Sequence, residues 1–433
     1  MRAFSLRAVR ASLRPGTSRV LLVSMLGVVL STADQSLFSY AIPGITREFR
    51  IGLNIIGQIL SISFLCASFA IVFVGLAADR FGRRAVFVVL LTASALCVGL
   101  HAVAPTILVL ATFRILGFAT GAGIYLIANT LVVEVAPDSY RGFVAGLLQI
   151  GYPLGFTLAS IVAAPLMITH GWRSIFYTGF AIALLAPLVG YFLPESHRFH
   201  TITASDRVGV SNAARLRFLF SPAFRTRTIV CFLGSFFVSL AIGGTTYFLP
   251  TYLVQAHSLT ASEASRIAGA AYAIGAVGYV VASFVGEFVT TRRNTLIIWT
   301  LAGSVAFALT IMLAQGPSGL IIGLGISVLF FYGSEAVRSP LIGELFPTHV
   351  RATASAVTGS LAVTTAWLIS PLLESYLAPA YGWTTAFMSC AVIPLALGGI
   401  IFLALVNLPS GISIEISSSA PEPAPYRRSF QAR

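Results

Sequence analysis

Long apolar stretches decide what this chain of 433 residues can fold into. Twelve runs of about 20 or more mostly apolar residues follow one another, and a helix of that length crosses the roughly 30 Å hydrocarbon core of a bilayer. The chain is 57% hydrophobic and only 9% charged, whereas soluble domains are about 45–50% apolar. We therefore expect an all-α, multi-pass membrane protein. The expected spans are 20–44, 54–77, 85–104, 106–134, 141–169, 173–193, 228–255, 264–289, 295–315, 318–345, 350–378 and 383–407.

The arginines predict the direction of the spans, because cytoplasmic loops collect positive charge. With the N-terminus inside, 21 of the 27 basic residues fall in inner segments, four in outer loops and two within spans. Both termini are therefore expected in the cytoplasm, with the protein in the plasma membrane. The net charge of +13 comes from these loops and forms no basic face of the kind that binds nucleic acid. We expect the lipid bilayer, and no nucleic acid, as a partner, and we expect a monomer.

One long polar stretch divides the chain into two parts. Residues 194–227 carry six arginines and form the only long internal loop between the expected spans. We expect a cytoplasmic N-terminal segment, a first bundle of six helices, this cytoplasmic loop, a second bundle of six helices and a disordered cytoplasmic tail. Their boundaries are 1–19, 20–193, 194–227, 228–407 and 408–433.

The two parts resemble each other in sequence. The pattern ExxPxxxR occurs from Glu134 to Arg141 and again, 210 residues later, from Glu344 to Arg351. A Gly-Trp pair precedes the sixth span and, 211 residues later, the twelfth. Transporter folds are often internal duplications, so we interpret the chain as a tandem repeat of six spans.

A charged stretch, GLAADRFGRR at 75–84, separates the second and third spans. It resembles the GxxxDRxGRR signature of the major facilitator superfamily, and the two ExxPxxxR segments resemble loops of its sugar-porter and organic-acid symporter branches. The resemblance covers roughly residues 20–407. It implies two pseudo-symmetric six-helix bundles around a central cavity, and transport by alternating access rather than enzymatic chemistry. No metal cluster or phosphate loop is visible in the sequence, so we expect no metal and no cofactor.

The charged stretch and the ExxPxxxR segments are candidates for a conformational latch. Gly75 is expected to let helices approach closely, and Asp79 to accept bonds from the N-terminus of a facing helix. The resemblance implies that such a network holds the halves in the outward-facing state. The alternative, charge that only sets topology, explains the arginines but not the glycine and the aspartate. The candidate residues are Gly75, Asp79, Arg80, Gly82, Arg83, Arg84, Glu134, Arg141, Glu344 and Arg351.

An ionisable side chain inside the bilayer costs free energy, so such residues within the spans are functional candidates by default. Asp34 lies about 14 residues into an outward-running span and Arg114 about eight into an inward-running one. At 1.5 Å per residue, both reach a similar depth, which predicts an ion pair. A carboxylate that loses such a partner in a dry site takes a proton, as a proton coupler must, and the pair resembles one in sugar:proton symporters. The alternative is a structural pair that ties two helices together.

Glu335 and Arg338 lie three residues apart near the middle of the tenth span, hence on one face. They could neutralise each other, or Glu335 could hold Arg338 toward the cavity, where its guanidinium suits a carboxylate. We count Glu335 with Asp34 and Arg114 as proton-coupling candidates. The substrate-binding candidates are Arg338, Tyr125, Asn129, Gln149, Tyr247 and Trp367, each of which could instead serve only in packing. Gln58 and Glu374 are weaker candidates.

The leading interpretation is a proton-coupled importer of a small organic anion, such as an aromatic or sugar carboxylate. Residues 32–49 loosely resemble the organic-acid branches, but Gln35 stands where one anion-symporter branch has Arg. A neutral sugar or polyol symporter is the alternative, since the ExxPxxxR segments suit it equally. Efflux by proton antiport is disfavoured, because GYPLGFTLAS at 151–160 lacks the Gly-Pro motif of drug antiporters. A membrane receptor on the same scaffold is also disfavoured, because the segments before the first span and after the last span are short.

Overall fold

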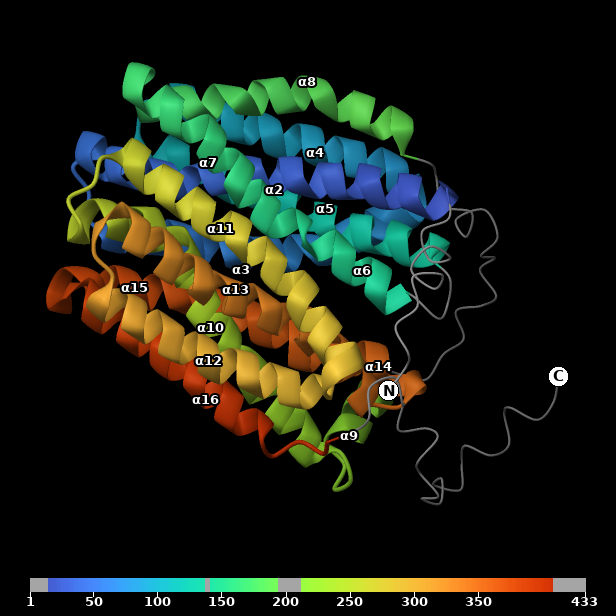
Figure 1. The fold of residues 1–433 in the computed structure, drawn as a ribbon. Helices are drawn as coiled ribbons and strands as arrows, with labels where there is room; N and C mark the ends of the chain where they lie inside the picture. The colour runs from blue at the N-terminus through green and yellow to red at the C-terminus, as the bar shows by residue number, and fades with distance from the viewer. Residues whose placement is uncertain (1–14, 137–140, 194–211, 408–433) are drawn as a thin grey trace.

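The computed structural model describes residues 15–136, 141–193 and 212–407, and every element in these ranges is a helix. Residues 1–14 of the N-terminal segment predicted at 1–19 lie outside the described residues, as does the tail predicted at 408–433, whereas 15–19 belong to the first helix. Figure 1 shows the long helices side by side. In chain order they are α2 (Pro15–Phe49), α3 (Leu53–Phe81), α4 (Arg83–Leu100), η1 (His101–Val103), α5 (Ile107–Val135), α6 (Arg141–Gln149), α7 (Gly151–His170), η3 (Trp172–Phe176), α8 (Tyr177–Phe192), α9 (Asn212–Leu219), α10 (Arg225–Ala256), α11 (Ala261–Phe284), η6 (Val285–Val289), α12 (Arg292–Leu313), α13 (Gly316–Leu345), α14 (Thr348–Ala354), η7 (Ser355–Leu361), α15 (Ala362–Phe387), η8 (Met388–Val392) and α16 (Ile393–Phe402).

The helices account for twelve membrane crossings. Eleven helical stretches in the described residues are long and apolar enough to span a bilayer. The last, Ser355–Phe402, has 48 residues, and at 1.5 Å per residue it is about twice as long as one crossing needs. It turns back at Gly382, whose φ of 84° is readily adopted only by glycine. The prediction of an all-α protein with twelve spans is thus confirmed.

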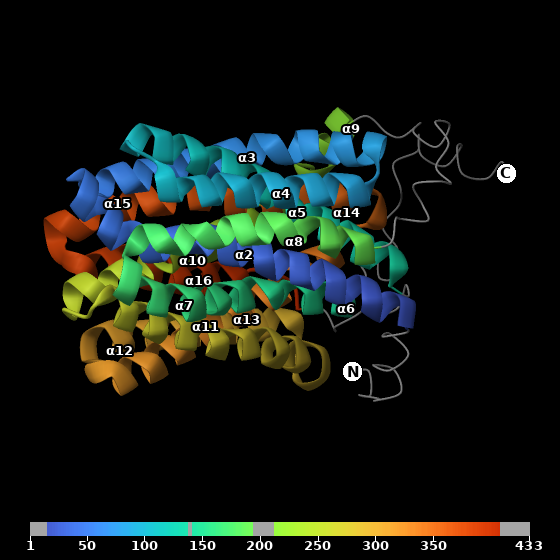
Figure 2. The same cartoon turned by 90° about the horizontal axis from the view of Figure 1, so that it is seen from above.

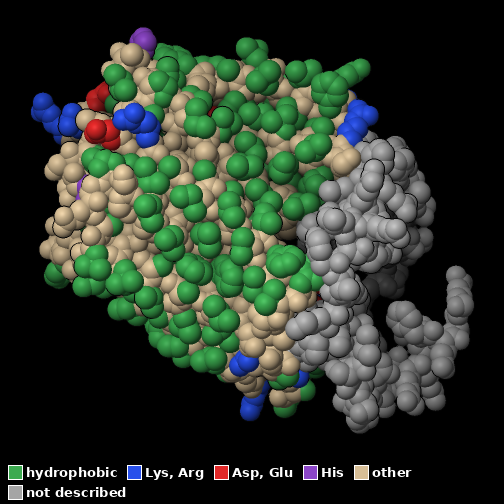
Figure 3. Space-filling view, in the orientation of Figure 1, with side chains coloured by type: hydrophobic (Ala, Val, Ile, Leu, Met, Phe, Trp, Pro, Cys, Tyr) green, Lys and Arg blue, Asp and Glu red, His purple; other side chains and the backbone are tan. Residues whose placement is uncertain are grey.

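The outer surface of the molecule is apolar. Figure 3 shows hydrophobic side chains over the broad middle of the molecule and charged side chains near its two ends. Leu184, for example, is 82% exposed and Leu108 is 75% exposed. Such a surface would be costly in water, whereas in a bilayer it contacts lipid tails.

The helices form two groups, each with six of the crossings. In Figure 1 α2, α4, α7 and α8 lie in the upper part, α12, α13, α15 and α16 lie in the lower part, and α11 (yellow) crosses between them. Across the boundary α7 packs against α11, α3 against α15 and α2 against α10. Within the loop predicted at 194–227, residues 194–211 lie outside the described part, and α9 and the start of α10 occupy most of the remainder.

The groups are hydrogen-bonded to each other near one end. We call the end that holds the starts of α2 and α10 the inner end, following the predicted orientation, and the opposite end the outer end. The described hydrogen bonds between the groups lie toward the outer end. They are Ser39 Oγ to Tyr247 O (2.6 Å), Ser160 Oγ to Ser265 O (2.6 Å), Thr157 Oγ1 to Gly269 O (3.3 Å) and Gln58 Nε2 to the Tyr376 hydroxyl (3.1 Å).

Close packing accompanies these bonds. A Cβ atom on Gly269 would lie 1.9 Å from Ser160 Oγ, and one on Gly57 would lie 2.0 Å from Ser375 Oγ. Since no side chain fits in such a space, glycine is what lets α11 approach α7 and α3 approach α15. The structure is therefore closed at its outer end.

Candidate functional site

Asp34 lies in the middle of α2, where it is almost fully buried at 1% exposure. Neither of its carboxylate oxygens has a hydrogen-bond partner. A buried, ionised carboxylate without partners costs several kcal/mol. The side chain therefore suits the protonated form in this conformation.

Arg114 of α5 is buried to the same extent. Its Nη1 donates to the backbone oxygen of Gln35 (2.8 Å) and to Gln35 Oε1 (3.1 Å), whereas its Nε and Nη2 make no hydrogen bond. The guanidinium carbon lies 4.7 Å from the ring centroid of Phe38, 4.8 Å from that of Phe118 and 5.5 Å from that of Tyr247. Each distance is within the range of a cation–π interaction.

The predicted ion pair between Asp34 and Arg114 is absent from this conformation. The two side chains interact electrostatically, but the described ion pairs involve other residues. The physical reason is the rotation of the helix, since neighbouring side chains on a helix point about 100° apart. Gln35 faces Arg114 and is itself held by Ser94 Oγ (2.7 Å) and Gly117 O (3.0 Å). Gln35, which marked a departure from one branch in the sequence, thus positions the arginine.

Aromatic rings from both groups of helices surround this site. Phe64 of α3 lies 4.8 Å from Phe118, 5.6 Å from Tyr247 and 5.2 Å from Trp367, measured between ring centroids. Tyr152 extends the chain of contacts toward Trp367 (6.4 Å) and Tyr332 (6.2 Å). We call the following set the aromatic cluster: Phe64, Phe118, Tyr152, Phe156, Tyr247, Tyr272, Tyr279, Tyr332 and Trp367.

The sequence identified only two members of the aromatic cluster, Tyr247 and Trp367. The available signal for the others was the presence of tyrosines in the interior of spans, because a tyrosine hydroxyl away from the membrane surface needs a polar partner. Tyr272 finds one in the backbone oxygen of Thr246, at 2.8 Å. The Tyr332 hydroxyl and Trp367 Nε1 are buried without a hydrogen-bond partner, so both could serve a ligand.

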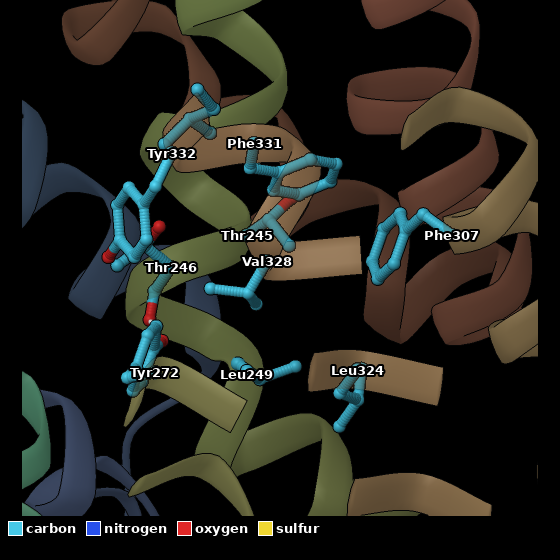
Figure 4. A pocket seen from close by; sticks show the side chains of 10 residues that line it. Thr245, Thr246, Leu249, Tyr272, Phe307, Leu324, Val328, Phe331 and Tyr332 are labelled. Carbon is cyan, nitrogen blue, oxygen red and sulfur yellow. Dashed lines mark hydrogen bonds between the residues drawn. The ribbon is translucent and has the colours of Figure 1, made fainter. Parts of the chain in front are cut away.

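A small cavity adjoins the aromatic cluster within the second group of helices. Its volume is about 10 Å³, which is enough for about one water molecule. Figure 4 shows the hydroxyl-bearing side chains of Tyr272, Tyr332 and Thr246 at one side of it and the ring of Phe307 at the other. Side chains thus fill most of this space while the outer end is closed.

Arg338 is paired with an acid of its own group of helices. Its Nη1 donates to Ser235 O (3.1 Å) and Ser239 Oγ (2.6 Å), and its Nη2 donates to Glu335 Oε2 (2.5 Å). Glu335 is the more accessible partner of the pair, with 21% of its side chain exposed. It interacts electrostatically with Tyr125 of α5 across the boundary. The structure therefore places Glu335, rather than Arg338, toward the opposite group.

For two other binding candidates, the structure shows no contact that indicates a role. Asn129 of α5 and Gln149, the last residue of α6, are both half-buried. Neither side chain is among the hydrogen-bonded groups found in the described residues. Both remain predictions as binding residues.

The latch candidates form ion pairs near the inner end, each within one group of helices. Arg83 Nη1 lies 2.9 Å from Glu134 Oε2 in the first group. Arg292 contacts Glu344 in the second group, and its Nη2 lies 2.5 Å from Glu287 Oε2. Arg292 thus contacts two acids of its own group.

The glycines of the charged stretch have different roles. Gly82 joins α3 to α4 with φ 90°, a conformation that favours glycine. A Cβ atom on Gly75, by contrast, would have no neighbour within 4 Å. The expectation that Gly75 allows a close helix approach is therefore wrong for this conformation, because α3 meets α5 through Val74 and Gly123 instead.

The remaining latch candidates are less clearly placed. Arg80 is exposed and lies over the Phe81 ring, and Arg84 is half-buried. Arg351 of α14 is half-buried, and its Nε has no hydrogen-bond partner. The side chains of Asp79 and Arg141 lie outside the described part of the structure. The role of a latch stays a prediction for all these residues.

Comparisons with known sequences indicate a transporter family. A sequence model of the Major Facilitator Superfamily matches residues 24–362. The cis,cis-muconate transport protein of Acinetobacter baylyi is 28% identical over 340 residues, which cover 77% of this chain and 81% of that protein. The gallate transporter of Pseudomonas putida is 26% identical over 360 residues (77% and 80%). A "Putative proline/betaine transporter" of Staphylococcus aureus is 29% identical over 357 residues (74% of each).

Solved structures share the fold. A D-xylose-proton symporter superposes with a TM-score of 0.73 at 18% identity and covers 91% of this chain and 99% of its own. A bacterial homologue of the human lysosomal transporter Spinster, in an inward-facing and occupied conformation, gives a TM-score of 0.71 at 16% identity, over 90% and 97%. These likenesses extend over both groups of helices.

Proposed function

The chain belongs to the Major Facilitator Superfamily and is a multi-pass secondary transporter, and from this premise we propose that it imports a small organic anion together with protons. The solute would bind between the two groups of helices, 20–193 and 228–407, and alternate between the two sides of the plasma membrane. Both termini would lie in the cytoplasm. The proposal names a solute class, a coupling ion and a direction.

One observation carries the proposal: Arg114 is buried at the aromatic cluster with two nitrogens free of hydrogen bonds. A guanidinium binds a carboxylate through two parallel hydrogen bonds, and the surrounding rings suit a flat, unsaturated body. Muconate and gallate, which two relatives are named for, combine a carboxylate with such a body. The contacts thus favour an unsaturated or aromatic carboxylate over a neutral sugar.

Arg114 replaces Arg338 as the proposed carboxylate ligand. The sequence favoured Arg338, but that guanidinium already makes three hydrogen bonds to its own group. Its charge is already paired with Glu335, so a substrate carboxylate would have to compete with that acid, and a charge-assisted bond is worth about 1.5–3 kcal/mol. Arg338 is better suited to holding Glu335 in place.

Asp34 is the proposed proton carrier. It is buried without a partner here, and in that setting the protonated form is favoured. Water reaching it from the inner side would allow the proton to leave and the charge to interact with Arg114. Glu335, at the boundary between the groups, is the second candidate for this role.

An uptake assay in proteoliposomes tests the proposal. Gallate, cis,cis-muconate and xylose would be offered with and without an inwardly directed proton gradient. We expect one of the carboxylates to accumulate only with the gradient, and xylose not to accumulate. Accumulation of xylose alone would overturn the anion proposal in favour of a sugar symporter.

A zwitterion such as betaine is the second candidate. Quaternary ammonium groups bind the faces of aromatic rings, and the aromatic cluster offers several rings beside Arg114. The Staphylococcus aureus relative has a name of this class. Inhibition of the carboxylate uptake by betaine, or uptake of betaine itself, would favour this candidate.

A further inference from the structure

A carboxyl group outside the proposed solute site is also buried without a counter-charge. Glu374 lies on α15, and its exposure is 0%. Its Oε1 accepts a hydrogen bond from Thr245 Oγ1 of α10 at 3.2 Å, whereas its Oε2 has no hydrogen-bond partner. The five described ion pairs all involve other acids.

The surroundings of Glu374 are built to enclose it. A Cβ atom on Gly244 of α10 would lie 2.7 Å from the carboxyl carbon of Glu374, so only glycine leaves room for the acid. Ser370, one turn earlier on α15, is bound to α10 through Gly244 N (2.8 Å) and Leu240 O (2.6 Å). The acid is therefore clamped between α15 and α10.

Few titratable groups face this acid. The Cys390 thiol of η8 interacts with it electrostatically, and α10 contributes the neutral side chain of Thr245. In the described contacts at this level, α3 contributes Gly57 and no titratable group. No neighbouring cation is thus available to compensate a negative charge on Glu374 in the described part of the chain.

Glu374 belongs to the part of α15 that closes the outer end. The adjacent Ser375 and the preceding Pro371 both meet Gly57 of α3, where a Cβ atom would lie 2.0 Å from Ser375 Oγ and 2.7 Å from Pro371 O. Glu374 precedes the turn at Gly382 by eight residues, or about 12 Å of helix. The acid is thus a short distance below the outer surface, behind the contact between α3 and α15.

An ionised Glu374 is incompatible with this closed arrangement. An unpaired charge in a dry interior costs several kcal/mol, and it can be lowered only by admitting water. The carboxyl group itself contacts α10, but the adjacent Ser375 contacts α3, so separating α3 from α15 uncovers the helix turn that carries the acid and is the movement that would let water approach it. Closing the contact therefore favours the neutral acid, and ionising the acid favours the open contact.

We propose that Glu374 is a second proton-binding site of this transporter, occupied while the outer end is closed and emptied when the contact between α3 and α15 opens. The site would load a proton from the outer side independently of Asp34 and of the solute. It goes beyond the proposed function, since it requires no particular substrate.

Distance measurements between spin labels on the full-length protein in lipid nanodiscs test this proposal. The labels would be attached to cysteines introduced at Arg47 and Tyr381, which are exposed at the outer end of the first and the second group and take no part in the bonds across the contact. In the otherwise wild-type chain, the open population should grow as the pH rises, by up to about tenfold in the open-to-closed ratio per pH unit for one proton. With Glu374→Gln the contact should stay closed, with less than about a twofold change per pH unit.

Two controls separate this site from others. Glu48→Gln removes an outer carboxyl that pairs with Arg173 on its own group, and it should keep the wild-type response. Asp34→Asn should also keep it, because in the proposed function Asp34 releases its proton toward the inner side. If Asp34→Asn abolishes the response while Glu374→Gln keeps it, the Glu374 site is refuted and the proposed function stands.

Other outcomes would also overturn the site. If the distance between the labels in the otherwise wild-type chain does not change with pH, or changes with sodium instead, proton binding at Glu374 is excluded. If Glu374→Gln does not fold, Thr245→Val provides the test. Loss of the hydroxyl donor disfavours the charged carboxylate, so the midpoint of opening should move to higher pH, and an unchanged midpoint would refute the proposal.

Discussion

Arg114 donates hydrogen bonds to both the backbone oxygen and the side-chain oxygen of Gln35, at 2.8 Å and 3.1 Å. The guanidinium is thereby fixed from one side only, and its Nε and Nη2 point away from these bonds without partners. A fixed but incompletely bonded arginine is prepared for a ligand, because the ligand need not order the side chain.

Replacing Arg114 by lysine should weaken solute binding while leaving the fold intact. Lysine keeps the charge but loses the planar pair of donors, and one charge-assisted bond is worth about 1.5–3 kcal/mol. The dissociation constant of the transported carboxylate should therefore rise about 10- to 150-fold, as measured by calorimetry. Arg338→Lys is the matched control, with a change below about threefold. Equal effects of the two substitutions would contradict the assignment of Arg114.

Asp34→Asn should separate coupling from transport. A permanently neutral side chain allows the loaded carrier to reorient, so solute exchange across the membrane should continue. Accumulation against a gradient should be lost, because no proton can be released. Both are measured with labelled solute in proteoliposomes. If the variant still concentrates solute in response to a pH gradient, Glu335 becomes the better candidate for coupling.

Gly57→Ala should prevent the outer end from closing. The added methyl would lie 2.0 Å from Ser375 Oγ, so α3 and α15 would have to separate. We expect slower uptake and faster labelling of a cysteine placed at Tyr376 by a membrane-impermeant reagent. Gly75→Ala on the same helix is the control, because its methyl would meet nothing within 4 Å. Normal uptake by Gly57→Ala would show that closure tolerates the methyl.

Arg83 and Glu134 should be energetically coupled. Their side chains are 10% and 13% exposed and 2.9 Å apart, so each single change to glutamine should destabilise the protein by about 1.5–3 kcal/mol. The double change should cost less than the sum of the singles in a double-mutant cycle of unfolding. The exposed pair of Glu48 and Arg173 serves for comparison, with an expected coupling below about 1 kcal/mol. Purely additive effects would contradict a stabilising pair.

Much of the fold could be predicted because membrane spans impose a simple pattern on sequence. Apolar length identified the crossings, and the repeated ExxPxxxR segments predicted a duplication. The structure contains corresponding ion pairs at both copies, Arg83 with Glu134 and Arg292 with Glu344. Apolar length could not reveal the break between α6 and α7 or the π-helical turns η6, η7 and η8, because these alter hydrogen bonding without altering hydropathy.

For the candidate site, the sequence predicted how deep the residues lie in the membrane but not which way their side chains point. Counting residues along a span gives the depth of a side chain, and Arg114 does bond to Gln35, the residue next to Asp34. The count does not give the direction in which a side chain points around the helix axis. That direction brought Gln35, rather than Asp34, to Arg114, and it gathered tyrosines from four helices that looked unrelated in the sequence.

The outer contact is held by four hydrogen bonds between uncharged groups. Each such bond contributes about 0.5–1.5 kcal/mol, so together they supply about 2–6 kcal/mol. A bound solute can offset that energy only through the difference between its affinities for the open and the closed outer end. A contact of about 2–6 kcal/mol corresponds to a difference of roughly 30-fold to 20,000-fold, so the solute must make contacts in one conformation that it loses in the other.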